Sequence, residues 1–405
     1  MAEPLLGKYL VLNRAANCSL NLVDSILSLS TYFCTQNFTL PQSPQRILLS
    51  NSAHLGDVLI LTTVLPVLKK AFPEAKIGLL IGSWSLQLVQ GNPMIDWIHT
   101  ADHWKLNRAD VSMWQKLKRY WHTRRQALRE IKDNRYEISI DLYPFFANFI
   151  PLLWEARIPV RIGYISGGFG SLLTHPQKWR NLNQHVSDYH VDLLKQLPIE
   201  KSHFVKLQYN LPPNECNNEY EVERLLTAAS IDLSNYIVIH MGTGNRQKEW
   251  PIVKWQTLIE KLHVYGCNLV FTGRGKREAD NAQLLMSQLS KCVNACNKIS
   301  WGAYISIIKR SKLIICLDSL AGHVAGAVDT PCIVIWSGLS NHHHWQPLSE
   351  SRQILRYPMP CAPCYRSHGC MTMDCVHGVQ VNDVYIAALN ALNELDNSQT
   401  NDAKR

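Results

Sequence analysis

An aspartate beside a glycine is the first residue of this chain whose type and position suggest catalysis. Asp57 follows Gly56, after the short apolar run Ile47 to Leu49 and a polar stretch that begins at Asn51. A carboxylate in the first turn of a helix complements the partial positive charge of the helix terminus, which is a purely structural role. Because the glycine lets a ligand approach the backbone, the same carboxylate could instead act as a general base.

A lysine in the second half of the chain suggests a site for phosphate groups. Lys248 lies in a polar loop that also contains Gly242 and Thr243, after the strand-like run Tyr236 to His240. Most lysines are solvated surface charges. A cation beside a helix start would, however, suit a pyrophosphate.

A second turn in the same half carries three further candidates. Asp318 and Ser319 follow the apolar run Leu313 to Cys316, and His323 lies in the helix that comes next. One interpretation is a helix cap with a core histidine. The other is phosphate bound to the N–H groups of the helix start, with the side chains holding a ribose or sugar hydroxyl.

The glycine pairs do not complete a nucleotide fingerprint. A third glycine is missing at Leu173, Gln247 and Glu278, where a dinucleotide motif would require one. The lysine of Gly275-Lys276 lacks the earlier glycine of a P-loop. The sequence therefore argues against NAD(P) and ATP hydrolysis, and it leaves a nucleotide held by looser loops.

The elements that must position these residues form two α/β patterns. Short apolar strands alternate with helical stretches over residues 45–212 and again over residues 213–392, where the last strand is Cys332 to Trp336. We expect the first helix to begin at Val58. Ligands bind at the carboxyl ends of strands in open α/β sheets. The pattern predicts two Rossmann-like domains with parallel sheets facing across a cleft, an N-terminal helical extension (1–44) and a flexible tail (393–405).

The bulk composition fits a large globular protein with acidic partners. A chain of 405 residues exceeds one ordinary core, and its net charge of +9 favours phosphorylated sugars, anionic lipid surfaces or nucleic acid. The twelve cysteines do not have the pattern of a secreted disulfide scaffold, and a reducing cytoplasm fits them better. We expect no signal peptide at Met1, and the segment from Ser25 to Gln42 is too polar to span a bilayer.

Two helical stretches have membrane binding as one of two interpretations. The apolar residues of the extension could pack on the first domain or lie on a membrane surface; these are Leu20, Val23, Ile26, Leu27 and Tyr32. A basic helix with aromatic residues is predicted near Trp114 to Arg135, and Arg124, Arg125 and Arg129 are its candidate acceptor-side or membrane-side residues. It is either a solvated face or a surface for anionic lipid or a phosphorylated lipid acceptor. Nucleic acid is not expected, because no recognised binding module accompanies it.

A cysteine cluster near the C-terminus offers four thiols. Cys361, Cys364, Cys370 and Cys375 could bind a structural zinc ion, although the usual two-pair spacing is missing. Free or redox-labile thiols are the alternative.

Four sequence pieces, in this order and spacing, resemble glycosyltransferase family 9, the lipopolysaccharide heptosyltransferase-like enzymes. The resemblance runs from about Arg46 to Leu392. The pieces are Leu55-Gly56-Asp57-Val58, Lys248-x-Trp250-Pro251, Asp318-Ser319 with His323-Val324-Ala325, and Cys361-Ala362-Pro363-Cys364.

The resemblance implies a GT-B fold and an inverting, metal-independent sugar transfer with no cofactor. Asp57 would be the catalytic base, and the donor would bind at Gly242, Thr243, Lys248, Asp318, Ser319, Leu320 and His323. The donor would be a nucleotide-sugar such as ADP-heptose, and the acceptor a cell-envelope glycan or lipopolysaccharide core. The protein would then be cytoplasmic, or peripheral on the inner face of the plasma membrane.

Three alternatives and one departure from the family pattern accompany this hypothesis. The chain could use another nucleotide-sugar, act as a GT-B-like sugar-nucleotide epimerase, or be a catalytically silent nucleotide- or glycan-binding protein. Many relatives carry glycine where Leu320 stands. Because leucine resists positive φ, we expect the turn and the donor preference to differ here.

Overall fold

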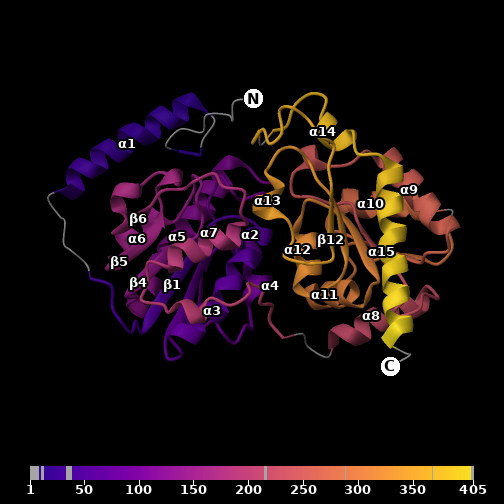
Figure 1. Ribbon diagram of the computed structural model, residues 1–405. Helices are drawn as coiled ribbons and strands as arrows, with labels where there is room; N and C mark the ends of the chain where they lie inside the picture. Colours follow the sequence, from indigo (N-terminus) through magenta and orange to yellow (C-terminus); the bar gives the residue numbers. More distant parts are fainter. Residues whose placement is uncertain are drawn as a thin grey trace. The chain divides into compact units, whose positions relative to one another are not determined.

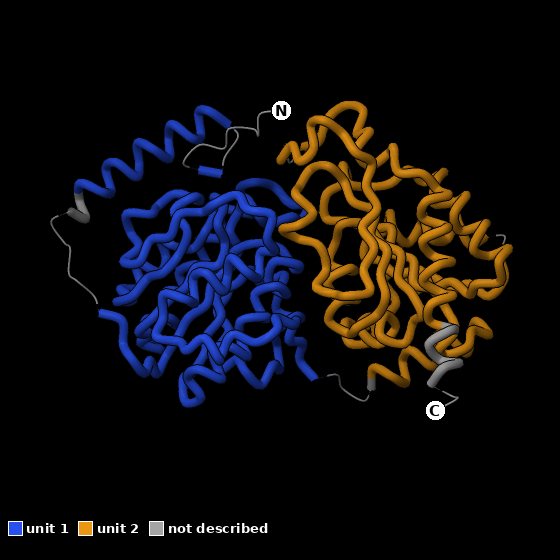
Figure 2. The backbone as a smooth tube through the Cα atoms, in the orientation of Figure 1, with its two compact units in different colours: residues 1–213 blue, residues 214–405 orange. Residues whose placement is uncertain are grey.

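Two compact units make up the protein, seen in the computed structural model of Figure 1 and coloured separately in Figure 2. The structure describes residues 9–10, 13–32, 39–213, 217–287, 289–366 and 368–402. Unit 1 is Met1–Pro213 and unit 2 is Asn214–Arg405, so the division falls one residue beyond the expected boundary. Residues 1–8, 11–12 and 33–38 of the predicted extension, and 403–405 of the predicted tail, lie outside the described residues.

Unit 1 is built on one parallel sheet of six strands in the order β3-β2-β1-β4-β5-β6. The central strands are buried along almost their whole length, which explains why they are nearly continuous apolar runs. The register pairs Ile47 with Ile77 on one side and with Ile138 on the other. The strands are β1 (Arg46–Asn51), β2 (Lys76–Ile81), β3 (Trp97–Thr100), β4 (Ile138–Asp141), β5 (Val160–Tyr164) and β6 (His175–Gln177).

Helices and short 3-10 turns connect these strands. The helices are α1 (Arg14–Tyr32), α2 (Leu55–Leu61), α3 (Leu65–Ala71), α4 (Leu86–Val89), α5 (Met113–Asn134), α6 (Ile150–Glu155) and α7 (Val186–Leu194). The 3-10 turns are η1 (Thr62–Val64), η2 (Ser83–Ser85), η3 (Ile165–Gly167), η4 (Gly170–Leu172) and η5 (Lys201–His203). None of the helices in the described part of the chain is long and apolar enough to cross a membrane.

Unit 2 repeats this topology with a second parallel sheet, in the order β12-β11-β10-β7-β8-β9. Its strands are β7 (Ile237–His240), β8 (Leu269–Thr272), β9 (Cys292–Asn294), β10 (Leu313–Leu317), β11 (Cys332–Ile335) and β12 (Arg352–Leu355). Its helices are α8 (Asn217–Ala228), α9 (Ile252–Val264), α10 (Lys276–Met286), α11 (Trp301–Arg310), α12 (Leu320–Ala327), α13 (His342–Trp345), α14 (Asp374–His377) and α15 (Val381–Asp402), with the 3-10 turn η6 (Arg246–Lys248). Both sheets therefore have the strand order of a doubly wound Rossmann fold, and the predicted α/β class with parallel sheets is confirmed.

The structure differs from the sequence-based expectation in three elements. Helix α2 begins at Leu55 rather than at Val58, so that Gly56 and Asp57 lie inside its first turn. The second sheet does not end at the strand that contains Cys332, because β12 adds one more edge strand. Helix α15 continues to Asp402, so the segment expected as a tail is helical for most of its length.

Candidate active site

The candidate base of unit 1 lies where the sheet changes its direction of winding. Strands β1 and β4 are neighbours at the centre of the sheet, and their connections leave in opposite directions along the strand order. Ligands of doubly wound sheets bind at this switch point, outside the carboxyl ends of the strands. Asp57 follows β1 and Tyr143 follows β4, so both residues belong to this edge of the sheet.

Asp57 has a structural partner at the start of α2. Its Oδ2 accepts a hydrogen bond of 3.4 Å from the backbone N–H of His54, the N-cap residue of the helix. The same His-x-x-Asp arrangement recurs at α7, where Asp188 Oδ2 accepts from His185 N–H at 3.2 Å. Capping is therefore a role that Asp57 shares with an ordinary helix start elsewhere in the unit.

Two further residues distinguish Asp57 from that ordinary helix start. The Asp57 carboxylate interacts electrostatically with the guanidinium of Arg108, which lies in the loop after β3, and with the hydroxyl of Tyr143. A positive charge near the carboxylate stabilises its ionised form. Three loops at the carboxyl ends of β1, β3 and β4 thus contribute one polar group each to a single place.

The candidate phosphate site of unit 2 occupies the corresponding switch point, between β7 and β10. Lys248 in η6 and Asp318 after β10 form an ion pair of 2.6 Å between Nζ and Oδ2, in which the carboxylate is buried. Ser340 Oγ also donates to Asp318 Oδ2 at 3.4 Å. The ion pair fixes the position of the ammonium group beside the end of β10.

The motif that contains Lys248 is anchored by its tryptophan. Trp250 is buried, packs edge-to-face on Trp255 of α9, and donates through Nε1 to the carbonyl oxygen of Val379 at 3.1 Å. Pro251 then serves as the N-cap residue of α9. A rigid anchor two residues away explains how a lysine on a loop can be held in one place.

The loop after β7 reaches the same turn through Thr243 and Gly242. Thr243 Oγ1 donates to the carbonyl oxygen of Asp318 at 3.4 Å. Gly242 is needed for a local reason, because a Cβ atom there would lie 2.0 Å from Glu278 Oε2. The glycine makes room for the half-buried carboxylate of Glu278 in its own unit, a role that sequence reasoning did not foresee.

The first turn of α12 contains no acidic residue, although Asp318 directly precedes its N-cap residue. Ser319 is its N-cap residue, yet its side chain makes no capping bond, and its buried Oγ has no hydrogen-bond partner within the described part of the structure. Leu320 is the first helical residue and does not have a positive φ. Leucine is therefore accommodated at this position without backbone strain, because helical φ and ψ are fully accessible to it.

His323 is buried one turn into α12. Burial, together with the positive charge of Lys248, lowers the pKa of His323 to about 4. The imidazole is therefore neutral at physiological pH. His323 therefore packs inside the unit beneath the turn and adds no charge to the site.

Sequence reasoning found most of these residues but missed Arg108, Tyr143 and Ser340. Tyr143 could have been found, because it comes two residues after the end of β4 at the predicted ligand-binding edge. Arg108 and Ser340 lie in loops that show no period and no recognisable motif. Only the fold brings them to the site.

The three arginines predicted for the acceptor or membrane side have different surroundings. Arg124 lies against α6 and forms an ion pair with Glu155. Arg125 and Arg129 are exposed on α5. Two of the three are therefore accessible to an external anion.

The four C-terminal cysteines do not form a metal site in this structure. Cys361 and Cys370 are exposed, whereas Cys375 is buried. Over the described ranges, no three His, Cys, Asp or Glu side chains are arranged to hold a metal ion. The geometry gives the zinc hypothesis no support.

Two doubly wound units, each with polar side chains at its switch point, define the class as GT-B. The family model for glycosyltransferase family 9 (heptosyltransferase) matches residues 124–373. The chain belongs to this family, as the sequence pieces predicted, and is a glycosyltransferase.

Individual relatives agree with this assignment. Lipopolysaccharide heptosyltransferase 3 of Escherichia coli is 24% identical over 303 residues, which cover 73% of this chain and 84% of the relative. Lipopolysaccharide heptosyltransferase 2 of Salmonella typhimurium is 24% identical over 325 residues, which cover 77% and 88%.

Solved structures show the same fold. A family 9 glycosyl transferase from Veillonella parvula has a TM-score of 0.71 at 20% identity, over 88% of this chain and 99% of that one. The Escherichia coli ADP-heptose lps heptosyltransferase II has a TM-score of 0.66 at 16% identity, over 87% and 99%.

Proposed function

We propose that the protein transfers a heptose from ADP-heptose to a lipopolysaccharide-core acceptor, or to a related cell-envelope glycan, with inversion at the anomeric carbon. The names of its relatives supply the sugar and the acceptor. One observation carries the donor side: Lys248 is held by Asp318 at the switch point of unit 2, beside a helix whose first turn has no acidic residue. A diphosphate requires such surroundings.

The proposed reaction is a single displacement. Asp57 accepts the proton of an acceptor hydroxyl while that oxygen attacks the anomeric carbon of the donor. The bond between the anomeric carbon and the diphosphate oxygen breaks, and the nucleoside diphosphate leaves with the electron pair. Attack from the face opposite the leaving group inverts the configuration.

The charge that develops on the leaving diphosphate has two sources of stabilisation. Lys248 supplies a full positive charge, and the N–H groups at the start of α12 supply a partial one. In the absence of substrate, Asp318 neutralises the charge of Lys248. In the complex, its carboxylate can accept a hydrogen bond from a hydroxyl group of the donor. We therefore propose transfer without a metal ion or cofactor, which activity retained in excess chelator would support.

The proposed acceptor places the reaction at a membrane. A lipopolysaccharide core is carried on lipid, so we propose that the protein works in the cytoplasm as a peripheral protein at the inner face of the plasma membrane. The exposed Arg125 and Arg129 offer charges to an anionic acceptor or lipid. Nucleic acid is not among the proposed partners.

Calorimetry with ADP, UDP, GDP and CDP tests the donor site. We expect ADP to bind most tightly, and Lys248→Ala to weaken it by about tenfold to a hundredfold, because a charge-assisted bond to phosphate is lost. Lys276→Ala is the matched control, because Lys276 forms an ion pair of the same length, 2.6 Å, with Asp280 on the exposed face of α10. It should leave ADP binding unchanged.

The other outcomes separate the alternatives. Preference for another nucleotide would keep the transferase and discard ADP-heptose. Turnover of a nucleotide-sugar without any acceptor would favour an epimerase. Equal ADP binding by Lys248→Ala and Lys276→Ala would remove the proposed phosphate site, and no binding of any nucleotide would favour a catalytically silent protein.

A further inference from the structure

Helix α1 carries its apolar residues on two opposite faces. Its inner stripe packs on unit 1 and consists of Leu20, Asp24 and Leu27. Its outer stripe, on the opposite side of the helix, consists of Cys18, Leu22, Ile26 and Leu29 at intervals of three or four residues. Leu22, Ile26 and Leu29 are 64%, 59% and 70% exposed.

The one acidic residue of α1 faces inward, whereas a surface helix usually directs its charged residues to water. Asp24 is the only charged residue between Ala15 and Gln45, and it is buried. It accepts hydrogen bonds of 2.7 Å from the Tyr9 hydroxyl and from the backbone N–H of Phe169. Beyond Arg14, four residues before Cys18, the outer stripe has no charged residue beside it.

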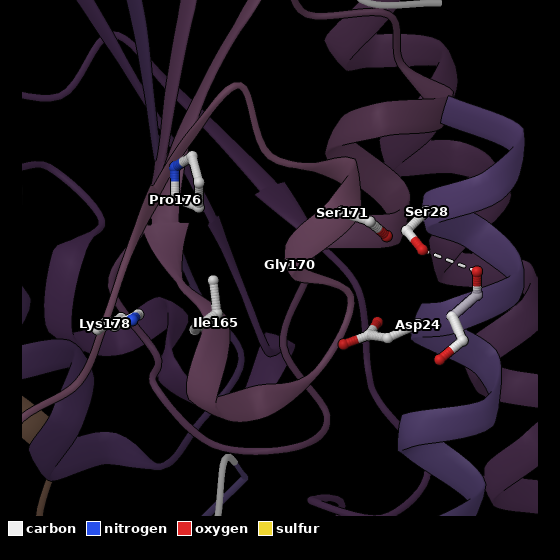
Figure 3. A pocket seen from close by; sticks show the side chains of 8 residues that line it. Asp24, Ser28, Ile165, Gly170, Ser171, Pro176 and Lys178 are labelled. Carbon is white, nitrogen blue, oxygen red and sulfur yellow. Dashed lines mark hydrogen bonds between the residues drawn. The ribbon is translucent and has the colours of Figure 1, made fainter. Parts of the chain in front are cut away.

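A cavity lies between α1 and the segment that leads into β6 (Figure 3). Its volume is about 300 Å³, and its lining includes Ser25, Ser28, Ser171 and Lys178. Leu20 and Leu27 pack inward beside this cavity, whereas Leu22, Ile26 and Leu29 stay exposed on the opposite side of the helix. Helix α1 is therefore anchored to the unit while its outer apolar residues remain uncovered.

Helix α5 has a second exposed stripe, which combines cations with tryptophans, whereas the α1 stripe is apolar. Residues of one α5 face, at intervals of three or four, are all exposed: Trp114, Lys118, Trp121, Arg125, Arg129 and Lys132. Tryptophans between cations are typical of helices that lie in the headgroup region of a bilayer. Unit 1 has 23 Lys and Arg against 15 Asp and Glu, a net +8, and α5 contributes seven of those cations against two acids.

The two stripes belong to one continuous layer of unit 1. Helix α5 packs on α6, and α6 packs on η4. Helix α1 in turn packs on η4, where Leu27 meets the cluster of Ile150, Leu172 and Leu173. Trp154 of α6, between the two stripes, is also exposed.

A bilayer fits these stripes better than a second copy of the chain. A stable interface between proteins uses about 20–30 residues on each side and excludes uncompensated like charges. The α1 stripe offers four side chains, and a second copy would bring the same cations of α5 against each other. An anionic bilayer takes apolar side chains without a shaped partner and neutralises the cations.

We infer that the outer stripes of α1 and α5 together form a docking face for an anionic phospholipid bilayer. This inference rests on the proposed function only in that the acceptor is carried by lipid. Apolar insertion by α1 supplies an anchor that is insensitive to salt, and α5 supplies one that is sensitive to salt. The face would hold unit 1 at the surface where a lipid-linked acceptor lies.

Sedimentation of the full chain with vesicles tests this inference. The vesicles are neutral phosphatidylcholine, alone or with about a third of phosphatidylglycerol. We expect the wild type to bind the anionic vesicles at least about tenfold more tightly. Leu22→Glu with Ile26→Glu should reduce that binding at least about tenfold, while Arg125→Gln with Arg129→Gln should reduce it several-fold and weaken its salt dependence.

Matched controls and the opposing outcomes keep the test decisive. Leu284→Glu changes a leucine of unit 2 that is 65% exposed, and it should leave vesicle binding unchanged, with circular dichroism reporting the fold of every variant. Equal binding by wild type and the α1 variant would overturn the inference, as would a dimer that the α1 variant converts to a monomer. ADP calorimetry tests only the donor site, which lies in unit 2. A failure of the vesicle experiment and a failure of the proposed donor site are therefore separate results.

Discussion

The two units share one strand order but differ in charge and in the chemistry of their switch points. Unit 1 has a net charge of +8, whereas unit 2, with 18 Lys and Arg against 17 Asp and Glu, has a net charge of +1. The helix after β1 carries Asp57 in its first turn, whereas the helices after β7 and β10, α9 and α12, carry no acid there. The same scaffold therefore has a carboxylate in the first turn of the helix in one unit and none in the first turn of the corresponding helices in the other.

This difference shows how a repeated topology can divide the work of one transfer reaction. A carboxylate at a helix start repels a phosphate but can accept a proton, whereas a helix start without an acid attracts a phosphate. The proposed division of labour follows from one residue type at one position of the fold. Removing the acidic residue from the helix start of unit 1, or adding one to the helix start of unit 2, should therefore abolish the functional difference between the units.

The largest effect is expected for Asp57→Asn. Loss of the base should lower turnover by about 10²–10⁴-fold and leave ADP affinity unchanged. Asp188→Asn is the matched control, because Asp188 occupies the same capping arrangement at α7. Both variants should lose similar stability, about 0.5–1 kcal/mol, so only activity should separate them. Equal turnover in the two variants would leave Asp57 with capping alone.

A smaller effect is expected when unit 2 is made to resemble unit 1 by Ser319→Asp. Because Ser319 Oγ is buried and makes no capping bond, a carboxylate there should lower thermal stability, and circular dichroism checks that the variant is folded. The added negative charge should weaken ADP binding about tenfold or more. Ser112→Asp, at the N-cap of α5, adds the same charge at a helix start that the proposed donor does not use. If both variants bind ADP like the wild type, the amides of α12 are not the phosphate site.

The smallest effect on function is expected at His323, which affects stability in acid and again separates the units, because His323 of α12 stands where α2 has Val58. The folded pKa of His323, about 4, lies below its unfolded value of about 6.5. The stability that neutral His323 contributes is therefore complete above pH 6.5, and it is lost as the pH falls from 6.5 to 4. The loss approaches about 3 kcal/mol. Calorimetric melting should show a flatter pH dependence for His323→Gln, and an unchanged one would assign the acid sensitivity to other groups.

The sequence predicted the scaffold better than the details of its helix starts. Buried parallel strands such as Leu313–Leu317 are continuous apolar runs, which the chain shows plainly. Strand β12 is only half-buried and reads Arg-Gln-Ile-Leu, so its sequence has no comparable signal. The start of α2 was misplaced because His54 is not a typical capping residue.

Within the candidate site, the motif residues could be predicted and the charges around them could not. Lys248 and Asp318 stood out beside predicted strand ends, but their ion pair depends on β7 and β10 being neighbours. Arg108 comes to Asp57 from a loop about fifty residues along the chain. Such contacts depend on strand order, which no local pattern encodes.

The hydrogen bond between Asp24 and Phe169 has a practical consequence for anyone who shortens this protein. Phe169 has a left-handed conformation, with φ of 63°, which costs an aromatic residue about 1–2 kcal/mol. Asp24 of α1 supports that conformation from a part of the chain that looks dispensable in a linear map. A truncated protein that begins at Pro44 would therefore not keep the remainder of unit 1 unchanged. The truncated protein would lack the Asp24 carboxylate that accepts from Phe169 N–H. We expect the backbone around Phe169, which leads into the edge strand β6, to change its conformation.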